Sequence, residues 1–175
     1  MNLITIVGAR PQFIKAAPVS AALLETGAIS ERILHTGQHF DDDMSAVFFR
    51  ELGIAPPAWN LGLGGGPHGA MTGAQLAGIE RILLDERPDA VLVYGDTNST
   101  LAGALAAAKL HIPVAHVEAG LRSFNRAMPE EINRRVTDAI TNWFFTTSTV
   151  ANENLRRAGV DDECIFFVGN TMIDT

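Results

Sequence analysis

The sequence has little cysteine and no long apolar run, and each shortage excludes a class of protein. Cys164 is its single cysteine, which excludes an intrachain disulfide framework and fits a cytoplasmic protein. No apolar stretch approaches the roughly 20 residues that a membrane span needs. The opening "MNLITIVGARP" lacks the basic start and the long apolar region of a secretory signal. We therefore expect a soluble, cytoplasmic protein with no membrane partner.

Basic residues are also scarce relative to acidic ones, which leaves a formal net charge of -7. This balance argues against nucleic acid or an anionic membrane as the main partner, although a local basic pocket could still hold an anion. Hydrophobic residues make up 47% of the chain and charged residues 19%, a globular composition. At 175 residues, the chain has the length of one domain with a sizeable core.

Apolar runs rich in β-branched residues alternate with segments of helical periodicity along the whole chain. Strands are predicted over 3–8, 32–37, 89–95, 112–118, 143–148 and 164–169, and helices over 11–25, 44–53, 71–88, 99–110, 130–140 and 150–159. This order predicts an α/β fold with a doubly wound parallel sheet, Rossmann-like, in a single domain over residues 1–175. The proline- and glycine-rich stretch 55–69 is expected to be a long mobile loop within that domain.

Polar residues follow the predicted strands at the points where the strands end. In a parallel sheet these ends share one edge, where ligands bind. The residues expected there are Arg10, Gln38, His39, Asp96 and Glu118. Helix capping by Asp96 and a solvated loop around Glu118 are the simpler alternative. Capping does not explain why polar groups gather at one edge, so we favour a binding site.

The cofactor motifs that this fold often carries are missing. The first turn reads "GARPQF", neither the dinucleotide-binding G-x-G-x-x-G nor a P-loop, so NAD and ATP hydrolysis are disfavoured and no cofactor is expected. Arg10 and Lys15 near a helix N-terminus would suit a phosphate or diphosphate, although Lys15 could equally be a solvated helix residue.

A metal site or a reactive nucleophile is also disfavoured. His35 and His39 have a spacing that pairs two metal ligands only on a helix, and their segment is a predicted strand end and loop. Cys164 begins a predicted buried strand with no base near it in sequence, which indicates a core position.

Three carboxylates remain as candidates for acid–base chemistry: Asp96, Glu118 and Glu130. Glu130 opens an amphipathic helix in which Ile132, Val136 and Ile140 share one side. Arg134 lies one turn after Glu130 on a different side, as in an ordinary surface ion pair. The helix start could nevertheless turn Glu130 toward the edge that carries Glu118.

The motifs "GARPQFIK", "TGQH", "GDTNSTLAGALAA", "HVEAGLRS", "MPEEINR" and "GNTMID" occur in this order and spacing in bacterial UDP-N-acetylglucosamine 2-epimerases. The resemblance covers essentially all 175 residues. It implies an isomerase with a two-domain, glycosyltransferase-B-like architecture, of which this chain is similar to the N-terminal half. The C-terminal domain would then be absent, and the fragment is expected to be inactive alone.

In that family, UDP is eliminated across C1–C2 of the sugar and then adds back with C2 inverted, for surface polysaccharide precursors. By motif match, the resemblance implies that Asp96, Glu118 and Glu130 are the acid–base residues. Arg10 would contact the diphosphate, and Lys15, Gln38, His39 and Arg134 would help bind the UDP-sugar substrate. Which carboxylate removes the proton stays open, and a homodimer is expected.

One departure bears on the substrate. Common family members have arginine after the Gln-His pair, whereas this chain has Phe40 and then three aspartates. Together with "LGLGGGPHGAMTG", this resembles the subgroup that acts on UDP-2,3-diacetamido-glucuronate. Two alternatives are a glycosyltransferase half-domain, against which "EAGLRS" and "MPEEINR" argue, and a non-catalytic nucleotide-sugar-binding domain.

Overall fold

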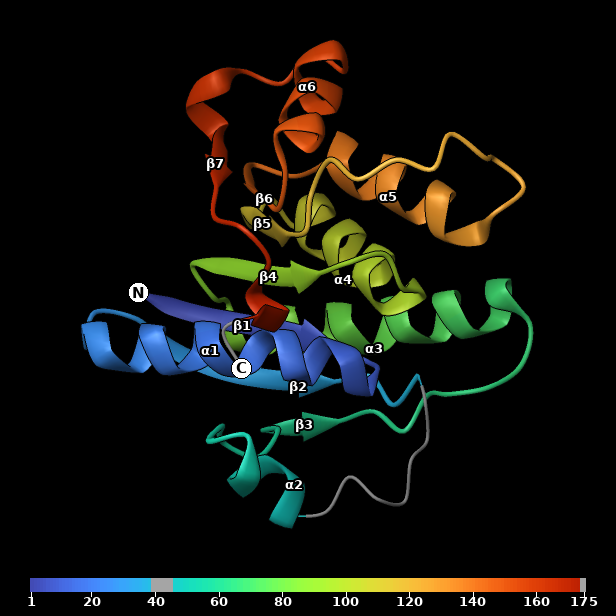
Figure 1. Ribbon diagram of the computed structural model, residues 1–175. Coiled ribbons are helices and arrows are strands. Elements are labelled where there is room, and N and C mark those ends of the chain that lie inside the picture. Colours follow the sequence, from blue (N-terminus) through green and yellow to red (C-terminus); the bar gives the residue numbers. More distant parts are fainter. Residues whose placement is uncertain (39–45, 174–175) are drawn as a thin grey trace.

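The computed structural model describes residues 1–38 and 46–173, and its centre is one seven-stranded, all-parallel sheet (Figure 1). The strand order is β3-β2-β1-β4-β5-β6-β7. The strands are β1 (Asn2–Val7), β2 (Ser30–His35), β3 (Trp59–Asn60), β4 (Ala90–Tyr94), β5 (Val114–Val117), β6 (Trp143–Thr146) and β7 (Ile165–Phe167). Strand order reverses between β1 and β4, and such a switch point is where doubly wound sheets bind ligands.

Helices lie on both faces of the sheet, which confirms the predicted doubly wound arrangement. The helices are α1 (Arg10–Thr26), α2 (Ala46–Glu51), α3 (His68–Glu86), α4 (Asn98–Lys109), α5 (Pro129–Ala139) and α6 (Thr149–Arg157), with short 3-10 turns at Asp162–Cys164 and Thr171–Ile173. Figure 1 places α1 on one face, and α3, α4 and α5 on the other. Within the described residues, no helix is long and apolar enough to cross a membrane.

The side chains of β4 show why this sheet needs cover on both faces. All five residues are buried, and they alternate between two apolar clusters. Leu92 and Tyr94 join the cluster on the α1 side, whereas Val91 and Val93 join the one under α3 and α4. A strand buried on both faces reads as a continuous apolar run, which is why "AVLVY" could be recognised from sequence.

The prediction of one long loop over 55–69 is wrong in part. Trp59 and Asn60 form a short edge strand that pairs with Leu34 and His35 of β2. The guanidinium of Arg32 also lies over the Trp59 ring, 4.7 Å from the centroid of that ring. A two-residue strand is too short to produce a periodic pattern, so only the surrounding prolines and glycines were visible in the sequence.

Helix α5 packs with its polar side inward. Its apolar residues Ile132 and Val136 are 38% and 39% exposed. The buried residues are Glu131, Asn133, Thr137 and Asp138. The side of α5 that carries the predicted apolar residues is therefore not the side that packs against the rest of the protein. Inward-facing polar groups need partners, and these partners form part of the candidate site.

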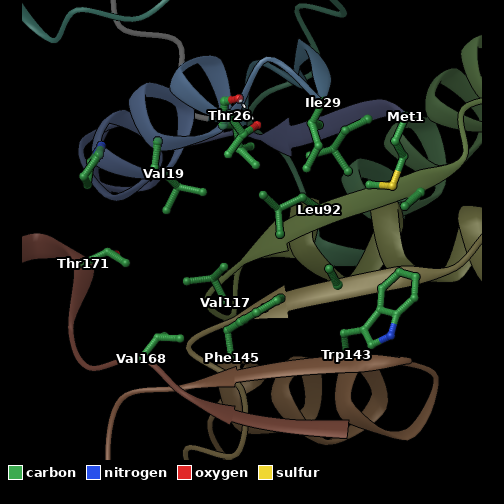
Figure 2. Close-up of a pocket in the computed structure, with 16 residues that line it drawn as sticks. Met1, Val19, Thr26, Ile29, Leu92, Val117, Trp143, Phe145, Val168 and Thr171 are labelled. Atoms are coloured by element: carbon green, nitrogen blue, oxygen red, sulfur yellow. Dashed lines mark hydrogen bonds between the residues drawn. The ribbon is translucent and has the colours of Figure 1, made fainter.

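An apolar groove of about 480 Å³ lies on the α1 side of the sheet (Figure 2). Its wall combines Val19 of α1 with Leu92, Val117 and Phe145 from three neighbouring strands. Trp143 lines one end of it and Val168 lines another part of the wall. This part of the parallel sheet thus has less helical cover than the opposite face, although parallel sheets are ordinarily covered on both.

Candidate active site

Gln12 ties the first turn of the site to the turn that follows β4. Its Oε1 accepts hydrogen bonds from the amides of Gly8 at 2.7 Å and Ala9 at 3.1 Å. Its Nε2 donates to the Tyr94 carbonyl at 2.8 Å and contacts the Thr97 and Thr100 hydroxyls. A buried amide with both ends engaged holds the ends of β1 and β4 in a fixed relation across the switch point.

Glu118 occupies the turn directly after β5 and pairs with Lys15 of α1. Lys15 Nζ lies 2.5 Å from Glu118 Oε2, and the two side chains are only 16% and 12% exposed. Glu118 has φ +68°, a left-handed conformation that is uncommon for a residue with a side chain. Backbone strain of this kind gathers at functional sites, so the turn supports the predicted role of Glu118.

Asp96 follows β4 and is bound by Arg134 of α5. Its Oδ2 accepts from Arg134 Nη2 at 2.6 Å and from Nε at 3.0 Å. The neighbouring Asn133 donates to the Asp96 carbonyl at 2.9 Å and to Asn98 Oδ1 at 3.2 Å. Two successive residues of α5 therefore hold the turn that carries Asp96. The pair of Arg134 with Asp96 is not the surface pair with Glu130 that the sequence alone allowed.

The two consecutive glutamates of α5 lie in different environments. Glu130 is exposed in the first turn, whereas Glu131 is fully buried. Glu131 accepts from the Ser123 amide at 2.8 Å, from Arg135 at 3.0 Å and from Arg134 at 3.3 Å. Burial raises the pKa of Glu131, but these donors outweigh it and lower the pKa to about 2. Glu131 is thus a fixed anion, and Glu130 is the carboxylate with access to solvent.

The remaining predicted binding residues lie toward β2 and α2. Gln38 accepts from the Ser99 amide at 3.0 Å and from its hydroxyl at 2.6 Å, which joins the turn after β2 to α4. Arg10 is exposed, with its guanidinium 5.0 Å from the centroid of the Phe48 ring. His39 and Phe40 lie outside the described residues.

Sequence reasoning missed Gln12, Asn133 and Glu131, because each gains its role from a partner far away in the chain. Gln12 had one available signal, a polar residue among the apolar residues of the buried side of α1, whereas Glu131 and Asn133 lie on a polar side of α5 that gave none. Within the described residues, no three His, Cys, Asp or Glu side chains are grouped to hold a metal ion. The prediction that Cys164 begins a buried strand is wrong: it ends the 3-10 turn before β7, and two of the three β7 residues are exposed. Its side chain is half-buried against the small apolar cluster of Ala119, Phe144 and Leu155.

The candidate site combines carboxylates with cations on one sheet edge, and comparison with known proteins identifies the family. The sequence profile described as UDP-N-acetylglucosamine 2-epimerase matches residues 21–175. The chain belongs to this epimerase family. It is 56% identical, over 100% of its length and 50% of the relative, to the UDP-2,3-diacetamido-2,3-dideoxy-D-glucuronate 2-epimerase of Pseudomonas aeruginosa.

A second relative has been solved with nucleotides bound. The chain is 52% identical to the UDP-N-acetylglucosamine 2-epimerase of Methanocaldococcus jannaschii, over 99% of the chain and 47% of the relative. The crystal structure of that enzyme in complex with UDP-GlcNAc and UDP superimposes with a TM-score of 0.94, covering 99% of this chain and 48% of the other. The chain thus spans about half the length of the epimerases it matches.

Proposed function

We propose that this chain is the N-terminal half of a cytoplasmic UDP-sugar 2-epimerase with a glycosyltransferase-B-like architecture. Its relatives are about twice as long, which supports a second half. The apolar groove between α1 and β4–β6 supports the same reading, because a segment of that half would bury it. We expect the chain alone to be inactive, since the substrate would meet one wall of the cleft only. We also expect the whole protein to be a homodimer, which analytical ultracentrifugation can test.

The proposed reaction inverts C2 of the sugar in two steps. A base removes the proton from C2, and the electron pair of that C–H bond forms a C1–C2 double bond. The C1–O bond breaks, and the electron pair of this bond leaves with the UDP diphosphate. UDP then attacks C1 again, and a proton is returned to C2 on the opposite face. Atoms and charge balance over the two steps, so no cofactor is required. The C2 proton has no adjacent carbonyl, so the reaction depends on well-placed acids and bases.

The pairing of carboxylates with cations at the sheet edge is the observation that carries this proposal. Asp96 is paired with Arg134 and Glu118 with Lys15 at the ends of neighbouring strands. Such cations could pass from the carboxylate to the departing diphosphate, whose charge grows as the C1–O bond breaks. Arg10, Gln38 and His39 would contribute to binding the nucleotide. Exposed Glu130 would approach the sugar from α5.

The decisive experiment uses a two-domain protein that carries this chain as its first half. Incubation with UDP-N-acetylglucosamine or its diacetamido-glucuronate analogue in D₂O, without an acceptor, should yield the C2 epimer with deuterium at C2. NMR of the sugar protons reads both outcomes, and Asp96→Asn serves as the inactive comparison. Transfer of the sugar only when an acceptor is present would identify a glycosyltransferase instead. Binding of the nucleotide sugar without either reaction would identify a non-catalytic domain.

A further inference from the structure

His116 is a buried histidine whose two ring nitrogens both face acceptors. It belongs to β5, and its side chain is 1% exposed. Nδ1 lies 2.8 Å from Asp138 Oδ1 on α5, and Nε2 lies 2.7 Å from the carbonyl oxygen of Gly95. A carbonyl oxygen can only accept, so Nε2 must carry a hydrogen for this contact to be favourable.

The other nitrogen carries a hydrogen as well if Asp138 is ionised, and the partners of Asp138 keep it so. Its Oδ2 accepts from the Gly120 amide at 3.1 Å and from Arg122 Nη1 at 2.6 Å. Two donors on Oδ2, one of them the guanidinium of Arg122, favour the charged form of this carboxylate independently of His116. An ionised carboxylate accepts only, which leaves Nδ1 as the donor.

The contacts of this pair reach every segment that carries a predicted acid. Gly95 immediately precedes Asp96, and Gly120 follows Glu118 by two residues. Asp138 belongs to α5, the helix that begins with Glu130. Among the described residues, the charged group that hydrogen-bonds to the pair is Arg122, from the loop after β5. From the β4 side the pair is contacted by the uncharged Gly95 carbonyl.

We propose that His116 is an imidazolium, ion-paired with Asp138, and that this buried pair is a positioning device that fixes the turns of Asp96 and Glu118 against α5. Neither residue needs to touch the substrate. The kinetic part of this inference rests on the proposed epimerase function, whereas the protonation state of His116 does not.

A spectrum of the ¹⁵N-labelled wild-type chain tests the protonation state without any variant. At about pH 7.5 an ordinary histidine is neutral, with one ring hydrogen. Both His116 ring nitrogens should instead show the signals of N–H groups. His35 is the internal control, because it is also buried, its pKa is lowered by burial, and its Nδ1 accepts from the Gly37 amide. Asp138→Asn should return His116 to a neutral ring. A single ring hydrogen on wild-type His116 would overturn the proposal.

Kinetics in the two-domain protein test the positioning role. His116→Gln and Asp138→Asn should each lower kcat by on the order of tenfold to a hundredfold, since small misplacement of reacting groups is costly. KM should change little, because binding groups are retained. Asn142→Ala is the matched control: it removes a side-chain hydrogen bond to Val114, at the other end of β5, and should keep the wild-type kcat. An unchanged kcat per folded molecule in both variants would overturn the role. Inactive wild-type protein would refute the proposed function but leave the spectroscopic result standing.

Discussion

Lys15 Nζ lies 2.5 Å from Glu118 Oε2, so residues 103 positions apart in sequence form one ion pair at the edge of the sheet. Lys15 comes from the second turn of α1, and Glu118 from the left-handed turn after β5. Both side chains are largely buried. The attraction between opposite charges is stronger in such a position than at the protein surface. Lys15 is therefore not a solvated helix residue, and its pairing with Glu118 supports its predicted place in the site.

Replacing Lys15 with methionine should lower turnover of the two-domain protein by on the order of a hundredfold. The change removes the positive charge that pairs with Glu118, and it also removes a cation that would stabilise the departing diphosphate. Lys109→Met is the matched control, since Lys109 is exposed at the end of α4. Steady-state kinetics on both variants provides the comparison. Equal turnover in the two would mean that the Lys15 pair serves stability only.

Glu130 and Glu131 allow a test within one helix turn. Glu130→Gln should reduce turnover by on the order of a hundredfold with little change in stability, as expected for an exposed acid–base group. Glu131→Gln should instead lower the free energy of unfolding by on the order of 1–3 kcal/mol, because the Ser123 and arginine donors lose a charged acceptor. Urea unfolding and turnover are measured on both. Loss of turnover only in Glu131→Gln would contradict the assignment of Glu130.

The contrast between these glutamates shows where sequence reasoning stops. Strand runs such as "AVLVY" were readable because burial on both faces leaves a continuous apolar signal. The strand ends then placed Asp96 and Glu118 at one edge. In α5 the apolar residues did not mark the buried side of the helix. The polar side is buried instead, because it hydrogen-bonds to Asn98 and His116, and the local sequence pattern contains no information about these distant partners. Partners separated by many residues are set by the topology of the sheet, and only the folded chain reveals them.

Acid should weaken the fold through Glu131 and Asp138. The pKa of Glu131 is lowered from 4.5 to about 2, and that of Asp138 is also below its ordinary value. A lowered pKa contributes stability above the ordinary value, and this stability is lost as the pH falls toward the lowered one. The wild type should therefore lose stability relative to Glu131→Gln between about pH 4.5 and pH 2. Thermal melts across that window measure it, and parallel pH profiles would contradict the assignment.

Gly8 should tolerate no side chain, because its backbone lies against two segments: the turn after β2, and helix α4. A Cβ there would come within 2.1 Å of Ser99 Oγ and 2.4 Å of Thr36 Oγ1. Gly8→Ala is therefore expected to lower the free energy of unfolding by on the order of 1–3 kcal/mol. Gly73→Ala, in α3, meets nothing within 4 Å and should be neutral or stabilise by up to about 1 kcal/mol. Urea unfolding compares the two, and equal effects would show that the close approach at Gly8 relaxes freely.

The glycine-rich segment before α3 suggests the substrate preference. A Cβ on Gly37 would lie 2.8 Å from Gly62 Cα, and one on Gly64 would lie 2.2 Å from the Gly37 carbonyl, so this segment packs on the turn that leads to Gln38. His68, which begins α3, contacts Asn98 at 3.0 Å. A C6 carboxylate on the sugar would be repelled by Asp96 and Glu118 unless backbone amides or a cation met it, and this segment could supply such amides.

We therefore predict that the two-domain protein prefers the UDP-diacetamido-glucuronate nucleotide over UDP-N-acetylglucosamine. Phe40, in place of the arginine of common family members, lies outside the described residues, but its lack of charge should also weaken any second, activating nucleotide sugar. The response of rate to substrate concentration should then be hyperbolic. Comparison of kcat/KM for both nucleotides on one preparation decides the preference. A higher value for UDP-N-acetylglucosamine, or a sigmoidal response to it, would refute the prediction and identify an ordinary UDP-N-acetylglucosamine epimerase.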